Sequence, residues 1–285
     1  MYIDAHAHLD RYPDDTLDSA LAEITQHEIF TVSNSMDLPS YRCNREIASR
    51  CDLVLPIFGV HPWNAPQYVE RLEELSAAIE ASPILGEIGL DHHFVEDAAQ
   101  YPAQQAVFEH FLAQARGKIV NLHTKGAESE VLRLLERYDV RRVIVHWYSG
   151  PLDVFEALAA RGACFTVGVE VRYSEHIQTI AKSVPAGQLL TETDNPGGPR
   201  SLIGELGMPR LVMDVVQTLA ALRGTTDEEI VRLVEANFLR LTEGDAGLAG
   251  VRARVVGVVR RQRPRGQGGH GGREGAGARR PGPHR

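Results

Sequence analysis

The sequence predicts a (β/α)8 barrel, in which eight parallel strands alternate with helices. Short runs rich in Val and Ile alternate with longer stretches whose apolar residues recur at helical spacing. Eight such units fit into about 250 residues, which is close to the usual size of this barrel. A doubly wound open sheet should instead carry a glycine-rich phosphate loop after its first strand, and here that position reads Asp4-Ala-His-Ala-His.

Each expected strand is a short apolar run, and the segments between strands are long enough for the crossovers that parallel pairing requires. The expected strands are residues 2–5, 29–33, 53–58, 84–88, 118–122, 142–145, 163–167 and 188–191. The expected helices include residues 16–27, 67–81, 102–116, 127–138 and 154–161, with two more at 209–223 and 226–240.

The composition changes sharply after residue 250. Residues 251–285 hold ten Arg, one Glu and nine of the chain's 26 Gly, whereas the first 250 residues hold 37 acidic and 20 basic side chains. The formal net charge of −8 therefore combines an acidic body with a basic tail. We expect residues 1–250 to form the barrel and residues 251–285 to be disordered, because the tail buries too little apolar surface to offset chain entropy. The tail fits an arm that contacts RNA or DNA or a dispensable extension, and the second interpretation is favoured.

The composition disfavours a membrane protein and an exported protein. No stretch approaches the roughly 20 apolar residues that span a bilayer, and the N-terminus lacks the basic region of an export signal. Cys43, Cys51 and Cys164 have neither C-x-x-C spacing nor disulfide density, which indicates a reducing cytoplasm. The acidic body argues against a dedicated basic groove for nucleic acid, although bound metal can reverse the field locally.

Side chains that bind metals or exchange protons stand at the ends of the expected strands. They are His6 and His8, His61, Glu87 and Asp91, His123, His146 and Asp194. In a barrel all of these carboxyl ends meet on one face, where the active sites of this fold lie. His6 and His8 alternate along one strand, so both imidazoles point to the same side and can bind one metal ion.

Each of these residues alone is a weak indicator. His123 and His146 could be capped core histidines, Glu87 could be a salt-bridged carboxylate, and Asp194 before Asn-Pro could be a turn or a helix N-cap. Four histidines and two carboxylates at matching strand ends are an improbable coincidence. The joint pattern therefore predicts a metal site.

Seven motifs occur in a recognisable order along the chain. They are His6-x-His8-Leu-Asp10, Gly59-Val-His61-Pro62, Gly86-Glu87-Ile-Gly-Leu-Asp91, His123-Thr-Lys125, His146-Trp-Tyr-Ser-Gly150, Glu192-Thr-Asp194-Asn-Pro196 and Asn237-Phe-Leu-Arg-Leu241. This set resembles the TatD family of metal-dependent deoxyribonucleases, within the amidohydrolase-like barrels. The resemblance leaves out only the Arg/Gly tail, and it implies cleavage of DNA phosphodiesters, commonly as a 3′ exonuclease.

The resemblance also implies a centre with two divalent metal ions. One ion would be bound by His6, His8 and Asp194 and the second by His123 and His146, with Glu87 as the bridge. A carboxylate suits a bridge because it offers two oxygens and a negative charge. Imidazole ligands favour Zn²⁺, Mn²⁺ or Fe²⁺, whereas phosphoryl transfer and the resemblance favour Mg²⁺ or Mn²⁺, so the identity of the ions stays open.

Three residues are candidates for the catalytic step. Besides the bridging Glu87, Asp194 can bind a metal and accept a proton as general base. His61 can donate a hydrogen bond to a phosphate oxygen or to the departing oxyanion. The alternative for His61 is that it only braces the Pro62-Trp63 loop.

The sequence departs from the family where the substrate should bind. Trp147-Tyr148 replaces the common Cys-Phe, Lys125 stands where Arg is common, and Gly197-Gly-Pro-Arg200 replaces an aromatic-leucine pair. Trp147 and Tyr148 are expected either to stack on a base or, more often, to pack within their loop. Lys125 and Arg200 are candidate phosphate contacts or, equally, solvated charges.

Residues that follow the fourth expected strand have weaker assignments. Asp91 could orient a ligand histidine from behind, and His92 and His93 are expected on the loop after it.

Three hypotheses of function remain. The leading one is a cytoplasmic, divalent-metal phosphodiesterase that acts on DNA ends. The second keeps the metal chemistry but changes the substrate to an amide, an ester or a lactone. The third is a catalytically silent component of a nucleic-acid or defence assembly, and it is disfavoured because a scaffold has no evident need for the full ligand set.

Overall fold

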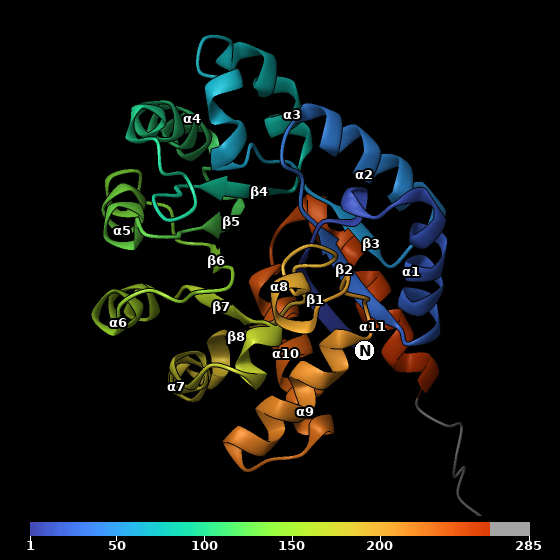
Figure 1. Cartoon of the computed structure of the whole chain (residues 1–285). Helices are drawn as coiled ribbons and strands as arrows, with labels where there is room; N and C mark the ends of the chain where they lie inside the picture. The colour runs from blue at the N-terminus through green and yellow to red at the C-terminus, as the bar shows by residue number, and fades with distance from the viewer. Residues whose placement is uncertain (263–285) are drawn as a thin grey trace, which may run out of the picture.

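The structure, a computed structural model, describes residues 1–262, with side chains described as far as residue 257. Eight strands alternate with helices along the chain, and the helices surround the strands (Figure 1). The strands are β1 (Tyr2–Ala7), β2 (Ile29–Ser33), β3 (Val54–Pro56), β4 (Ile84–Gly89), β5 (Ile119–His123), β6 (Val143–Val145), β7 (Cys164–Val167) and β8 (Leu189–Thr191). The helices are α1 (Asp14–Gln26), α2 (Leu38–Arg50), α3 (Ser76–Ala81), α4 (Tyr101–Gln114), α5 (Glu128–Arg137), α6 (Leu152–Ala160), α7 (Glu175–Ser183), α8 (Arg200–Ile203), α9 (Leu211–Arg223), α10 (Asp227–Leu241) and α11 (Ala249–Gln262).

The strands pair in parallel and in chain order, which is the arrangement of a (β/α)8 barrel. The strands β1 to β3 form one sheet and β4 to β8 form the other. A bridge between Phe58 and Leu85 connects β3 to β4. On the other side, the Asp194 amide donates to the His6 carbonyl (2.9 Å), which ties the end of β8 to β1. The fold class predicted from the sequence is confirmed.

The pairing is irregular at two places that matter for the site. The register of β1 against β2 shifts across the stretch that contains His6, and the register of β4 against β5 shifts across the stretch that contains Glu87. Such irregularities re-aim side chains at the rims of barrels.

The helix α2 shows where apolar spacing fails as a predictor. It begins after Asp37, whose side chain accepts a hydrogen bond from the Ser40 amide (2.9 Å) as an N-cap. Its buried face includes the polar side chains of Ser40 and Asn44, so periodic apolar residues do not reveal it. The helix expected at residues 67–81 is also shorter than predicted, because 3-10 turns occupy its first part and only α3 is α-helical.

Apolar side chains from the strands and the surrounding helices form one large core, with a smaller cluster between α1, α2 and the first strands. Within residues 1–262, no helix is both long and apolar enough to cross a membrane.

The fold continues beyond residue 250. Val251 and Val255 on α11 are buried in the large core, and Arg254 donates to the backbone carbonyl of Asp52 (2.6 Å). The disorder expected from residue 251 is therefore wrong for residues 251–262. Averaging the composition over the whole tail hides two valines at i, i+4 spacing, which place an apolar stripe on one helix face. The remainder of the expected tail, residues 263–285, lies outside the described residues.

Substituting Val255 tests whether α11 belongs to the folded domain. Val255 is fully buried, so Val255→Asp should lower the free energy of unfolding by about 2–4 kcal/mol, because an unpaired carboxylate would enter the core. Val256 is 38% exposed, and Val256→Asp should change the free energy of unfolding by less than about 0.5 kcal/mol. Urea denaturation measures both. Equal effects of the two substitutions would contradict the assignment of α11 to the core.

Candidate metal centre

The carboxyl ends of the strands bring together the side chains that the sequence singles out. His6 lies in β1 and His8 follows it, His61 follows β3, Glu87 lies in β4, His123 ends β5, His146 follows β6, and Asp194 lies just beyond β8. All of these except His6 line one cavity of about 670 Å³ on this face of the barrel.

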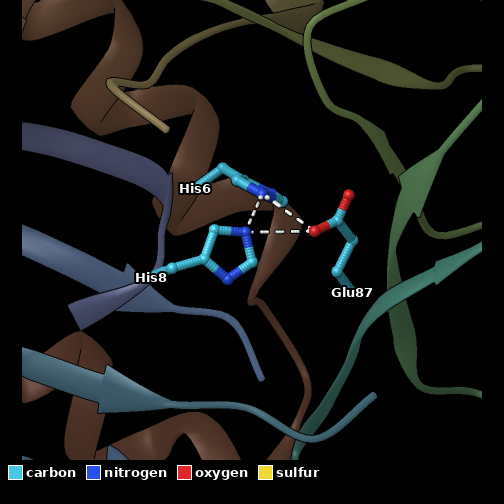
Figure 2. Close-up of side chains that lie close together, drawn as sticks. All are labelled: His6, His8 and Glu87. Carbon is cyan, nitrogen blue, oxygen red and sulfur yellow. Dashed lines mark hydrogen bonds and ion pairs between the residues drawn. The ribbon is translucent and has the colours of Figure 1, made fainter. Parts of the chain in front are cut away.

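One group of ligand atoms comes from His6, His8, Glu87 and Asp194. The Nε2 atoms of the two histidines lie 3.2 Å apart. Glu87 Oε2 lies 3.5 Å from His6 Nε2 and 3.1 Å from His8 Nε2. Figure 2 shows the two rings and the carboxylate pointing toward one another. Asp194 Oδ1 lies 3.6 Å from the first of these nitrogens and 3.5 Å from the second. We call these four residues the first ligand group.

A second group surrounds the other oxygen of Glu87. Glu87 Oε1 lies 2.8 Å from His123 Nδ1, 3.0 Å from His146 Nε2 and 3.5 Å from His61 Nε2. The facing nitrogens of His123 and His146 are 3.4 Å apart. We call Glu87, His123 and His146 the second ligand group. The carboxylate of Glu87, only 2% exposed, thus directs one oxygen to each group.

Hydrogen bonds behind the first two rings show that the first group fits a cation. His6 Nδ1 faces the side-chain carbonyl of Asn121, and His8 Nδ1 faces the backbone carbonyl of Asn34, both at 3.1 Å. Because both partners accept, each Nδ1 must donate, and each Nε2 of a neutral ring then carries a lone pair. Two lone pairs that face each other at 3.2 Å repel unless a proton or a metal cation lies between them.

Carboxylates stand behind the rings of the second group. Asp91 Oδ2 lies 2.9 Å from His123 Nε2, and with the ring proton on Nε2 the Nδ1 atom of a neutral ring would direct its lone pair to a cation beside Glu87. Glu192 Oε2 lies 3.4 Å from His146 Nδ1, which is an ion-pair distance without hydrogen-bond geometry. Carboxylate–histidine pairs of this kind are typical of imidazoles that bind metals.

His61 has the opposite hydrogen-bond arrangement. Its Nδ1 accepts from the Trp63 amide (3.2 Å), so the proton of the neutral ring is on Nε2, the atom that faces Glu87. Burial lowers the pKa of His61 to about 4, which keeps the ring neutral near pH 7. His61 is close enough to share a metal ion with Glu87 and His123. A nitrogen that carries a proton, however, cannot bind a metal ion. These bonds favour a hydrogen-bond donor over a metal ligand.

The charge of Glu87 determines where protons sit in the metal-free protein. Burial would raise the pKa of Glu87, but the surrounding histidines hold it well below its usual value. Burial would lower the pKa of His8 and of His146, yet the nearby carboxylates, Glu87 above all, raise them to about 9 and about 10. Protons therefore occupy the positions where a divalent cation would neutralise the same charge.

The backbone around Asp194 fixes the direction of its carboxylate. Asp194 has a φ of 53°, in the left-handed region that residues other than glycine seldom adopt. The Gly198 amide donates to the Asp194 carbonyl (2.9 Å). A Cβ atom at Gly198 would lie 2.1 Å from Asp194 Oδ2, so only glycine leaves the carboxylate in this position. Burial raises the pKa of Asp194.

Two residues of the site have no role in the sequence-based prediction. Asn121 bonds to His6 and donates to the Ala5 carbonyl (3.0 Å), and Glu192 accepts from Thr166 Oγ1 (2.7 Å) beside His146. Asn121 stands two residues before His123, and Glu192 stands two residues before Asp194. A spacing of two places Asn121 and His123 on the same face of β5, and this was the available signal for Asn121; Glu192 and Asp194 lie beyond β8, where the strand rule does not apply.

The aromatic residues and the histidine expected on the loops near the substrate differ in their exposure and contacts. Tyr148 is 3% exposed and donates to the Pro151 carbonyl (2.6 Å), so it packs within its loop and cannot stack on a base. Trp147 lines the cavity, and its indole donates to Glu170. His92 stacks on Tyr101, with ring centroids 3.8 Å apart.

The candidate phosphate contacts both line the cavity. Lys125 Nζ donates to the Trp147 carbonyl (2.7 Å) and to Ser149 Oγ (2.8 Å), and burial lowers the pKa of Lys125. Arg200 is exposed at the start of α8. Arg11, which the sequence did not single out, is a further exposed cation on the same rim.

Comparison with known proteins identifies relatives over most of the chain. The profile of a family described as TatD related DNase matches residues 3–243. The metal-dependent hydrolase YcfH of Escherichia coli K12 is 31% identical over 258 residues, which cover 86% of this chain and 96% of the relative. Human deoxyribonuclease TATDN3 is 25% identical over 261 residues, which cover 84% of this chain and 93% of the relative. The crystal structure of YjjV, a TatD homologue from Escherichia coli K12, superposes with a TM-score of 0.76 at 25% identity, covering 84% of this chain and 97% of YjjV.

Alanine substitutions at His61 and His123 test the difference between donor and ligand. His123→Ala should weaken the binding of Zn²⁺ by more than about 100-fold, because losing a ligand costs more than the roughly 10–100-fold lost with an outer partner. His61→Ala should leave the affinity nearly unchanged, because its inner nitrogen carries a proton. Isothermal titration calorimetry measures both constants. A comparable loss of affinity in His61→Ala would make this residue a ligand.

Proposed function

The chain belongs to the TatD-related DNase family and is a metal-dependent hydrolase acting on ester bonds, and on that basis we propose that it hydrolyses phosphodiester bonds at DNA ends. In this proposal it removes nucleotides from the 3′ end with two divalent cations, which are Mg²⁺, Mn²⁺ or Zn²⁺. The position of Glu87 carries the proposal, because each of its oxygens faces a separate set of imidazole nitrogens.

The two ligand groups divide the cations between them. The first group would hold one cation through His6, His8 and Asp194, and the second would hold the other through His123 and His146, with Glu87 offering one oxygen to each group. Bound there, the cations would polarise a phosphoryl oxygen and make a water molecule easier to deprotonate.

Two side chains handle the proton and the leaving group. Asp194 accepts the proton of the attacking water, because its carboxylate lies beside the first ligand group. The water oxygen bonds to phosphorus, the P–O3′ bond breaks, the nucleotide leaves with its 5′ phosphate, and the departing O3′ takes up a proton from solvent. His61 donates from Nε2 to the departing O3′ or to a phosphate oxygen, where charge develops in the transition state.

The cavity supports a DNA end as the substrate better than a duplex. Its volume of about 670 Å³ lies within the range of small-molecule sites, so it accommodates about one nucleotide. Lys125, Arg200 and Arg11 on its wall or rim offer positive charge to phosphates. The rest of the first 250 residues is acidic, which disfavours binding along a duplex.

We also propose that the protein works in the cytoplasm, on the spacing of its cysteines. Cell fractionation with an antibody tests this location, and recovery in an exported fraction would contradict it.

Removing the metal should abolish nuclease activity. Treatment with a chelator should stop the shortening of a 5′-labelled oligodeoxynucleotide from its 3′ end, and adding Mg²⁺ or Mn²⁺ should restore it, because the ligand groups cannot activate water without cations. Asp194→Asn should be inactive under all of these conditions. Gel electrophoresis of the labelled products measures the outcome.

Two results of this experiment would contradict the proposal. Hydrolysis of aryl esters or lactones without cleavage of DNA would move the substrate to the amide, ester or lactone class. No hydrolysis of any substrate by the metal-loaded protein would favour a catalytically silent component of an assembly.

Adjacent glycines provide a matched test of the Asp194 position. Gly198→Ala should lower kcat by about 100-fold, because the new methyl group would displace the Asp194 carboxylate by a distance on the order of 1 Å. Gly197→Ala should leave kcat nearly unchanged, since a Cβ atom there meets nothing within 4 Å. Steady-state kinetics measure the rates, and circular dichroism establishes that both variants fold. Equal rates for both variants would argue against Asp194 as the base.

A further inference from the structure

Two exposed aromatic side chains lie beside the metal ligands. Trp63 is 48% exposed and Phe94 is 59% exposed, which is unusual for side chains of this size. Both line the cavity that contains His61, Glu87 and His123. Of the large hydrophobic side chains that are exposed among the residues described, these are the two on the cavity wall.

A single carboxylate holds both aromatic residues in place. Trp63 Nε1 donates to Asp91 Oδ2 (2.7 Å), and the Phe94 amide donates to Asp91 Oδ1 (2.7 Å). The same Asp91 Oδ2 faces His123 Nε2 at 2.9 Å. Burial would raise the pKa of Asp91, but the hydrogen bonds from His123 and its neighbours hold it below its usual value. The position of the indole is therefore fixed relative to the second ligand group.

The rings of His61, Trp63 and Phe94 pack edge to face, one against the next. Trp63 and Phe94 meet edge to face, with centroids 6.2 Å apart and planes at 81°. Trp63 also meets His61 edge to face, with centroids 4.7 Å apart and planes at 78°. An aromatic surface that is rigid and exposed loses little conformational entropy when a flat ligand covers it.

We propose that Trp63 and Phe94 form a stacking platform for the base of the nucleotide whose phosphate enters the metal centre. The inference rests on the proposed function and deepens it, because it names the part of the substrate that this wall binds. Stacking on an indole tolerates any base, since every base presents a π-face. The base must leave its own stack to reach the platform, so frayed or single-stranded ends are the preferred substrates.

A nucleobase fits this wall better than a purely anionic or purely apolar ligand. The cavity combines the aromatic pair with cations from Lys125, Arg200 and Arg11, and a nucleotide offers one partner for each. A simple phosphate would leave the aromatic pair exposed, and a simple apolar ligand would bring no anionic group to the cations.

Fluorescence tests the platform without using catalysis. The chain has two tryptophans, so Trp147→Phe leaves Trp63 as the only indole. Titration of this variant with dAMP in the presence of Ca²⁺ should give saturable quenching, whereas deoxyribose 5-phosphate, which lacks a base, should give none. Equal quenching by both compounds, or none by either, would overturn the proposal.

Kinetics on two kinds of 3′ end separate stacking from an indirect effect through Asp91. Trp63→Ala should lower kcat/KM about 5- to 150-fold on an oligodeoxynucleotide with an ordinary 3′ nucleotide, and it should have little effect on one that ends in an abasic residue. Trp63→Phe should recover part of the loss, because phenylalanine still offers a ring. Equal losses on both substrates would overturn the proposal and show that Trp63 acts by positioning His123.

A matched pair of variants tests the second ring. Phe94→Ala should lower kcat/KM on the ordinary end, whereas Tyr173→Ala removes an aromatic side chain that is 53% exposed but lies outside the cavity wall, and it should have no effect. Equal effects of the two substitutions would remove Phe94 from the platform. If quenching by dAMP occurs but the wild-type protein cleaves no DNA end, the proposed function fails while the platform stands.

Discussion

The buried carboxylate of Glu87 is the constraint on which the site depends. Its two oxygens face nitrogen atoms from five imidazoles, and each of these rings lies 3.5 Å or less from one of the oxygens. A buried negative charge is stable only when positive charge compensates it. Protonated histidines compensate it in the metal-free protein, and the arrangement of lone pairs favours replacing those protons with cations.

The barrel provides the rigidity that this constraint needs, because residues on other strands of the barrel support the rings from behind. Asn121 on β5 bonds to His6 on β1, and Glu192 beyond β8 approaches His146 beyond β6. A shift of one strand by one residue would turn these side chains to the opposite face. The geometry of the ligands therefore depends on the register of the sheet. The register shifts around His6 and Glu87 help to set the directions of these two side chains.

The sequence predicts the strands and the candidate ligands because both depend on local patterns. Alternation along β1 places His6 and His8 on the same side of the chain. The carboxyl ends of the parallel strands meet on one face of the barrel, whatever the exact positions of the helices. The role of His61 is different, because its tautomer depends on a backbone amide whose direction the fold decides. Exposure is equally non-local: Tyr148 looks available in the sequence but is buried, whereas Trp63 is exposed beside the ligands.

Electrostatics explain why this site would combine cations with an aromatic wall. The first 250 residues carry 37 acidic and 20 basic side chains, so phosphate contacts along a DNA backbone can release few counterions. Binding energy must then come from within the cavity. Under the proposed function, divalent cations would attract the single phosphate at the reaction centre, and stacking on Trp63 would add affinity that does not depend on charge. An acidic protein would in this way bind one nucleotide at the end of a strand while repelling the rest of the polymer, which would confine the reaction to ends.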